Sequence, residues 1–70
     1  MRRKAPAQRG MIRKRQAFLT AELRREHLSY EQVQQMDTDR SKVGLHIIGL
    51  TIAQIETELA WIGRMMANID

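Results

Sequence analysis

Eight large apolar residues recur through the second half of the chain at alternating spacings of 3 and 4, without a break. They are Leu45, Ile48, Ile52, Ile55, Leu59, Ile62, Met66 and Ile69, and they are called the apolar seam below. This alternation keeps side chains on one side of an α-helix, and it is typical of a helix that packs against another helix. We therefore expect one long helix from near Asp39 to about Asn68 in an all-α fold.

Two further rows follow the same helix. Small residues lie beside the apolar seam at Gly49, Ala53, Ala60, Gly63 and Ala67. A set of large apolar residues, called the outer stripe below, projects from nearly the opposite side: Val43, Ile47, Leu50, Trp61 and Met65. A helix with one neighbour would be polar there, so we expect a second neighbour. Each glycine inside a helix costs about 1 kcal/mol relative to alanine, which suggests a packing role for Gly44, Gly49 and Gly63.

A shorter amphipathic helix is expected from Met11 to His27. One side of its helical wheel carries its larger apolar residues, with Phe18 among those expected to be buried: Met11, Ile12, Phe18, Leu19 and Leu23. The same arc contains Arg15, Glu22 and Glu26. Charges on such an arc are expected to be paired. Antiparallel helices would bring Arg15 near Glu56, so we expect an ion pair between them, either across the two helices of one chain or between two chains.

The connection between these helices has a helix-start signature. Ser29 is a suitable N-cap, Gln32 stands at the reciprocal capping position, and Leu28 and Val33 flank them as a hydrophobic staple. This predicts a short connecting helix from Tyr30 to about Met36. The polar run at 37–39 should end it and cap the long helix.

The expected lengths lead to a prediction of dimerisation. At 1.5 Å per residue, the first helix would reach about 25 Å and the long helix about 45 Å. The first helix would then leave the last turns of the apolar seam uncovered. We therefore expect a helical hairpin with a short connecting helix that forms a homodimer through the apolar seam of the long helix, giving a bundle.

Size and composition agree with this architecture. A chain of 70 residues without cysteine has a marginal core and no disulfide to reinforce it, which favours oligomerisation. Residues 1–10 are expected to form a basic flexible arm and residues 11–70 a single helical domain. No apolar run is long enough to span a bilayer, and no apolar segment follows the N-terminal bases as in a secretory signal. A cytoplasmic location is expected.

The basic residues are concentrated near the N-terminus. Residues 1–20 contain seven bases and no acid, whereas residues 21–70 contain five bases and eight acids. Such a segment suits a polyanion, because Lys and Arg contacts to phosphates supply most non-specific affinity for nucleic acid. An equally simple interpretation is a solvated tail that keeps a small dimer in solution. The expected phosphate contacts are Arg2, Arg3, Lys4, Arg9, Arg13, Lys14, Arg24 and Arg25.

Catalytic chemistry is not indicated. His27 and His46 lack a second ligand at helical spacing, so no metal site is expected. Ser29, Thr38 and Ser41 stand where capping explains them. Glu56 and Glu58 diverge by about 200° on a helix and cannot act together as acid and base. We expect no cofactor, no small-molecule substrate and no enzymatic activity.

The segment 28–36, Leu-Ser-Tyr-Glu-Gln-Val-Gln-Gln-Met, resembles the opening helix of the helix-turn-helix in sigma-factor-type and related regulators. The resemblance covers nine residues and implies a recognition helix beginning near Arg40. The turn at 37–39 departs from that pattern because it lacks the usual glycine and apolar anchor. The implied recognition helix carries just Arg40 and Lys42 among apolar residues, whereas groove reading needs polar side chains.

Two classes of function remain open. The first is a small dimeric nucleic-acid-binding or transcription-associated protein that uses the basic residues named above. The alternative is a protein-binding modulator or inhibitor, of the kind that mobile elements and phages encode, acting on an acidic or regulatory protein through Leu50, Trp61 and Met65. With three aromatic residues in the chain, duplex binding is favoured over single-strand binding, which relies on base stacking.

Overall fold

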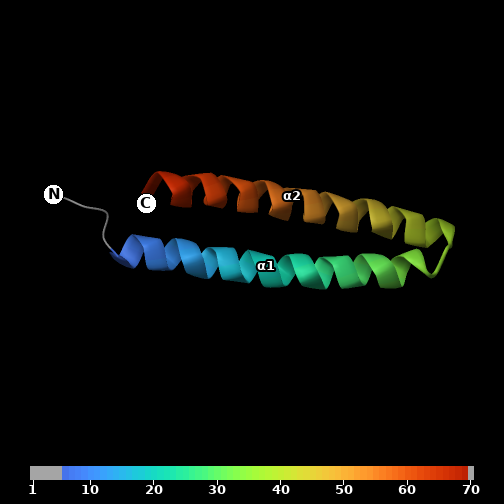
Figure 1. The fold of residues 1–70 in the computed structure, drawn as a ribbon. Helices are drawn as coiled ribbons and strands as arrows, with labels where there is room; N and C mark the ends of the chain where they lie inside the picture. Colours follow the sequence, from blue (N-terminus) through green and yellow to red (C-terminus); the bar gives the residue numbers. More distant parts are fainter. Residues whose placement is uncertain (1–5, 70) are drawn as a thin grey trace.

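The computed structural model describes residues 6–69, which form two antiparallel helices. Helix α1 runs over Pro6–Gln34 and helix α2 over Asp39–Ile69. The chain leaves α1, turns within four residues and returns along its whole length, so that the first turn of α1 lies beside the last turn of α2 (Figure 1). The prediction of an all-α helical hairpin is confirmed. The expected arm falls partly in α1 and partly outside the described residues.

The predicted connecting helix is wrong. Ser29, expected to cap a new helix, lies inside α1, and the helix continues through Tyr30 to Gln34. The physical reason is packing: the row of α1 that faces α2 keeps its 3 and 4 spacing through Tyr30 and Val33. Helices in proteins are stabilised mainly by such tertiary packing, which here overrides the local cap signal.

The turn between the helices is short and tightly hydrogen-bonded. The amide of Gln35 donates to the carbonyl of Glu31 over 3.3 Å, and the amide of Met36 donates to the carbonyl of Val33 over 3.0 Å. Asp37 follows with a φ of 50°, the left-handed conformation in which helices commonly end and which Asp tolerates better than most residues.

Helix α2 begins with a reciprocal cap. The amide of Thr38 donates to Oγ of Ser41 over 2.7 Å, and the amide of Ser41 donates to Oγ1 of Thr38 over 3.0 Å. Asp39, in the first turn, adds the negative charge that a helix N-terminus favours. The expected start of the long helix at Asp39 and its capping by the polar run are confirmed.

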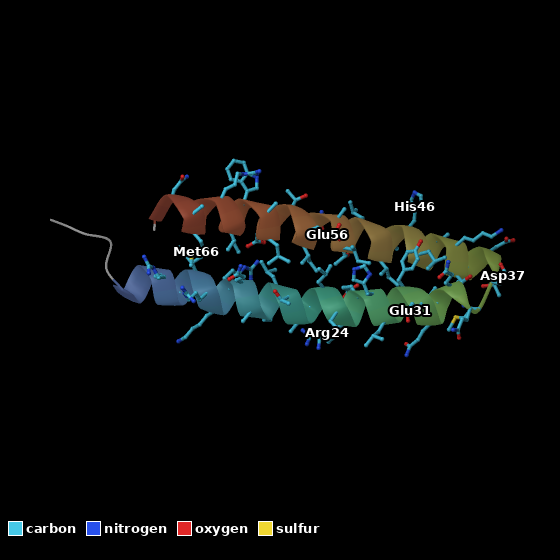
Figure 2. The ribbon with its side chains drawn as sticks, viewed as in Figure 1. Arg24, Glu31, Asp37, His46, Glu56 and Met66 are labelled. Carbon is cyan, nitrogen blue, oxygen red and sulfur yellow. The ribbon has the colours of Figure 1, made fainter. Side chains whose placement is uncertain are left out.

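The core is the contact between one row on each helix. From α2 the apolar seam faces α1, and Met66 can be seen pointing across to it (Figure 2). The facing row of α1 is partly polar: Ile12, Gln16, Leu19, Leu23, Glu26, Tyr30 and Val33. Among the large apolar side chains described, Leu19 and Ile62 are buried at 4% exposed, and the others of both rows are half-buried. Two helices alone therefore cover this core incompletely.

The predicted shortfall in length is also wrong. Helix α1 has 29 residues against 31 in α2, so both reach about 45 Å. As a result α1 covers the apolar seam as far as Met66. The prediction that Phe18 is buried is also wrong. Its side chain is 51% exposed, because the row of α1 that contacts α2 runs through Leu19 and Leu23.

Two of the three α2 glycines lie against α1. A Cβ at Gly44 would lie 3.5 Å from Cγ1 of Val33, and one at Gly49 would lie 3.9 Å from Cε2 of Tyr30. Both distances are ordinary contacts, so the space would accept alanine. A Cβ at Gly63 would meet nothing within 4 Å. The packing role expected for the glycines is thus limited to the half of α2 near the turn.

Candidate functional site

Outside the contact between the helices, two faces of the hairpin carry distinctive side chains. One is the basic face of α1, and the other is the outer stripe of α2. Within residues 6–69, no group of three His, Asp or Glu side chains is placed to hold a metal ion. Neither helix, over the same residues, has an apolar stretch long enough to cross a bilayer.

The basic face of α1 begins in a segment without acids. Between Pro6 and Ala21 the helix contains four bases and no Asp or Glu. Of the residues predicted to bind nucleic acid, Arg13, Lys14, Arg24 and Arg25 are exposed and Arg9 is half-buried. Arg2, Arg3 and Lys4 lie outside the described residues. Arg25 pairs with Glu22 through a contact of 2.9 Å. Of these exposed cations, Arg13, Lys14 and Arg24 form no ion pair with a carboxylate among the residues that the structure describes.

Arg13 and Arg24 stand at the two ends of a shallow groove on the outer surface of α1. The groove has a volume of about 520 Å³ and is called the basic groove below; its lining is Arg13, Gln16, Ala17, Thr20, Ala21 and Arg24. The Thr20 hydroxyl donates to the Gln16 carbonyl over 2.8 Å, so the floor is low. The two arginines are separated by 11 positions, or about 16 Å along the helix. Sequence reasoning found the arginines but missed the run of small residues between them, which is visible at Ala17, Thr20 and Ala21.

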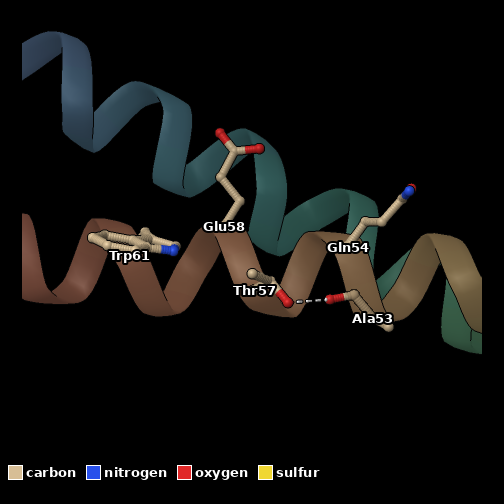
Figure 3. Close-up of a pocket in the computed structure, with 5 residues that line it drawn as sticks. All are labelled: Ala53, Gln54, Thr57, Glu58 and Trp61. Carbon is tan, nitrogen blue, oxygen red and sulfur yellow. Dashed lines mark hydrogen bonds between the residues drawn. The ribbon is translucent and has the colours of Figure 1, made fainter.

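Arg15 belongs to a different feature, an ion pair between the helices. Its Nε donates to Oε2 of Glu58 over 2.8 Å and its Nη2 donates to Oε1 over 3.0 Å. Both side chains remain about half exposed. The hydrogen bond from Arg15 lowers the pKa of the Glu58 carboxyl, and the same bond raises the pKa of the Arg15 guanidinium. Glu58 reaches toward α1 (Figure 3).

The pairing of Arg15 with Glu56 expected within one chain is therefore wrong. On α2, positions 56 and 58 lie about 200° apart around the helix, on opposite sides of the apolar seam. In an antiparallel pair, the side of α1 that carries Arg15 lies next to the side of α2 that carries Glu58. The prediction placed the partner of Arg15 at nearly the correct height along α2, but on the wrong side of the apolar seam.

The outer stripe of α2 is exposed to solvent in the single chain. All five of its residues are exposed, and Leu50 and Trp61 are each 60% exposed. The guanidinium of Arg64 lies over the Trp61 ring, 4.6 Å from its centroid. Leu50, Trp61 and Met65, the predicted partner surface, thus lie along one face of one helix.

Two shallow grooves interrupt this face. The first, of about 460 Å³, is lined by Ala53, Gln54, Thr57, Glu58 and Trp61 (Figure 3). Its floor is low because the Thr57 hydroxyl donates to the Ala53 carbonyl over 2.9 Å. The second, of about 380 Å³, is lined by His46, Ile47 and Leu50.

The apolar seam, predicted as a dimer interface, has a partner within the chain. Its residues from Leu45 to Met66 lie against α1, and the side chain of Ile69 is outside the described part. A second copy is not needed to give this row a neighbour.

Comparison of the chain with protein-family models, curated proteins and solved structures found no match. Segment 28–36 forms the end of α1 and the first residues of the turn, and the helix after it, α2, lies antiparallel along α1.

Proposed function

We propose that the hairpin is a small nucleic-acid-binding or transcription-associated protein that contacts the phosphates of a duplex through α1 and acts as a homodimer through α2. The observation that carries this proposal is the basic groove, in which two exposed arginines flank small side chains, with Arg13 inside the acid-free segment and Arg24 two residues beyond Glu22.

Small residues between cations favour a phosphate backbone as the ligand. Ala17, Thr20 and Ala21 keep the helix surface low, so that a ligand strand can approach while Arg13 and Arg24 reach its phosphates. Arginine suits this role because its planar guanidinium matches phosphate oxygens in bidentate geometry. The chemistry offers charge neutralisation more readily than base readout, so the proposed binding is weakly sequence-dependent.

The test is the salt dependence of binding to duplex DNA. Replacing both Arg13 and Arg24 with Ala should weaken binding to unrelated sequences equally, and it should reduce the slope of log K against log salt by about 0.9 for each lost contact. Arg40→Ala, which removes an exposed arginine of α2, is the matched control and should leave the slope unchanged. Absence of measurable duplex binding at low salt would contradict the proposal.

A second candidate is a protein-binding modulator that acts on a regulatory protein. The observation that favours it is the outer stripe, since exposed apolar patches of this length on small proteins mark interaction surfaces. Substitution of Leu50 or Trp61 should then abolish capture of the partner while the hairpin stays folded. Capture should also survive nuclease treatment, whereas partners held through nucleic acid should be lost.

A further inference from the structure

One symmetry operation relates two of the exposed side chains of the outer stripe, Leu50 and Trp61, to the two grooves described on the same face of α2. In helix packing of the coiled-coil type, a projecting side chain enters a hole formed by four residues of the facing helix. Such holes consist of positions i, i+3, i+4 and i+7. The first groove contains one complete hole, formed by Gln54, Thr57, Glu58 and Trp61. The second contains three of the four members of another, His46, Ile47 and Leu50, and Val43 completes it in sequence.

The positions of these holes match the positions of Leu50 and Trp61. The first hole is centred between Thr57 and Glu58, and the point halfway between it and Leu50 falls beside Gln54. The second hole is centred between His46 and Ile47, and the point halfway between it and Trp61 falls at the same place. A two-fold axis that passes beside Gln54, between two copies of α2, therefore seats Leu50 in the first groove of the other copy and Trp61 in the second groove of that copy.

We propose that the occupant of the outer stripe is a second copy of this chain, docked antiparallel along α2 with the two-fold axis at Gln54. The contact is isologous: each copy contributes the same two side chains and the same two grooves. Trp61 and Leu50 are the central anchors, in the way that a few large buried side chains dominate most interfaces. Gln54 meets its own counterpart on the axis, where two amides can exchange hydrogen bonds and fix the register.

The exposed surface of the chain is large enough for this dimer. A stable interface of standard size buries roughly 800 Å² on each partner, a small share of the 5543 Å² that the chain exposes. Five exposed apolar side chains on one helix supply the apolar centre that such interfaces have.

This inference deepens the dimerisation part of the proposed function and does not rest on nucleic-acid binding. The apolar seam remains between α1 and α2 of each chain, and α2 pairs with α2 of the other copy across the outer stripe. Because the outer stripe lies nearly opposite the apolar seam, both α1 helices remain on the outside. Each dimer then displays two basic grooves.

The single tryptophan provides the first measurement, made without nucleic acid. Trp61 is the one Trp of the chain, so its emission should shift to shorter wavelength as protein concentration rises, in step with dimer formation by analytical ultracentrifugation. Leu50→Glu should weaken the dimer at least 30-fold, as loss of a central anchor does. Leu28→Glu is the matched control, because Leu28 is a similarly exposed leucine (54%) on α1, and it should leave the dimer unchanged. Circular dichroism should show both variants helical.

Cross-linking provides the second measurement, and it does not depend on weakening the protein. The chain has no cysteine, so Gln54→Cys places a single thiol on the proposed axis and should give a disulfide-linked dimer under mild oxidation. Ala60→Cys, an exposed position in the row of small residues, should stay uncross-linked. A protein that remains monomeric at millimolar concentration would overturn the proposal. So would equal loss of dimer in the two leucine variants, or cross-linking through Ala60→Cys in place of Gln54→Cys.

Discussion

Arg15 and Glu58 form the bidentate contact that joins the middle of α1 to the second half of α2, and it makes stability depend on pH in a defined direction. Arg15 lowers the pKa of Glu58 in the folded protein. A lowered carboxyl pKa contributes stability that is present above the unfolded value, near pH 4.3, and is lost as pH falls through the folded value. Because both side chains are solvent-exposed, the contribution is small.

Glu58→Gln should therefore reduce the acid sensitivity of the hairpin. Wild type should lose more thermal stability between pH 6 and pH 3 than the variant does, and the two curves should converge at the acid end. The measurement is the melting temperature by circular dichroism across that range. Glu56→Gln is the control; if it changed the acid limb as much as Glu58→Gln, the ion pair would not be the cause.

A second residue-scale prediction concerns the open space at Gly63. Because a Cβ there meets nothing within 4 Å, Gly63→Ala should gain helix propensity without a clash, stabilising the fold by up to about 1 kcal/mol. For a domain of this size, that corresponds to a rise of roughly 4–8 °C in melting temperature. Gly44→Ala, which places its methyl group in ordinary contact 3.5 Å from Val33, should gain a similar amount. A lower melting temperature for Gly63→Ala would show that this face is occupied.

At the scale of the helices, Thr38 and Ser29 both have the sequence signature of a helix cap, but we expect opposite effects when each is replaced by alanine. Thr38 caps α2 through the reciprocal bonds with Ser41, so Thr38→Ala should cost about 1 kcal/mol. Ser29 lies inside α1, where alanine is the better helix former, so Ser29→Ala should be neutral or stabilising. Thermal melts of both variants test this. Equal destabilisation by the two would mean that α1 is broken at Ser29.

The same pair explains how much of the helices could be predicted from sequence. Helix α2 was predicted almost to its ends because the apolar seam is unbroken and Asp39 opens it. Helix α1 was predicted too short because its contact row includes Gln16 and Glu26, which hide the 3 and 4 spacing in a hydrophobicity pattern. A cap signal at Ser29 then outweighed a row that becomes visible only once α2 is packed against it.

At the scale of the whole molecule, the fold depends on very few buried side chains. Domains typically have about 0.05–0.15 kcal/mol of stability per residue, which gives this chain at most about 10 kcal/mol. Ile62→Ala removes one of the two apolar side chains that are buried in the described part of the chain and should cost about 2–5 kcal/mol. Ile47→Ala, on the exposed outer stripe of the same helix, should cost far less in dilute solution. Urea unfolding followed by circular dichroism measures both.

The hairpin itself was predictable, because one long apolar row and one amphipathic partner helix allow little else. The surfaces were predictable only in part. Charge and hydrophobicity identified Arg13, Arg24, Leu50 and Trp61. The grooves beside them depend on small residues, which can be assigned to a surface only once it is known which face of each helix is exposed. The expected dimer interface fell on the apolar seam because α1 was taken to be too short to cover it.

The four-residue turn has a kinetic consequence. It brings Val33 next to Gly44, a pair separated by 11 positions, whereas Arg15 and Glu58 are 43 positions apart. The entropic cost of closing a loop rises with the length of the loop. Contacts nearest the turn are therefore the least costly to form first, and contacts toward Met66 form afterwards. Substitutions at Val33 or Tyr30 should therefore slow refolding. Substitutions at Ile12 or Met66 should instead accelerate unfolding. The refolding and unfolding rates of the variants would then distinguish the two ends of one continuous interface.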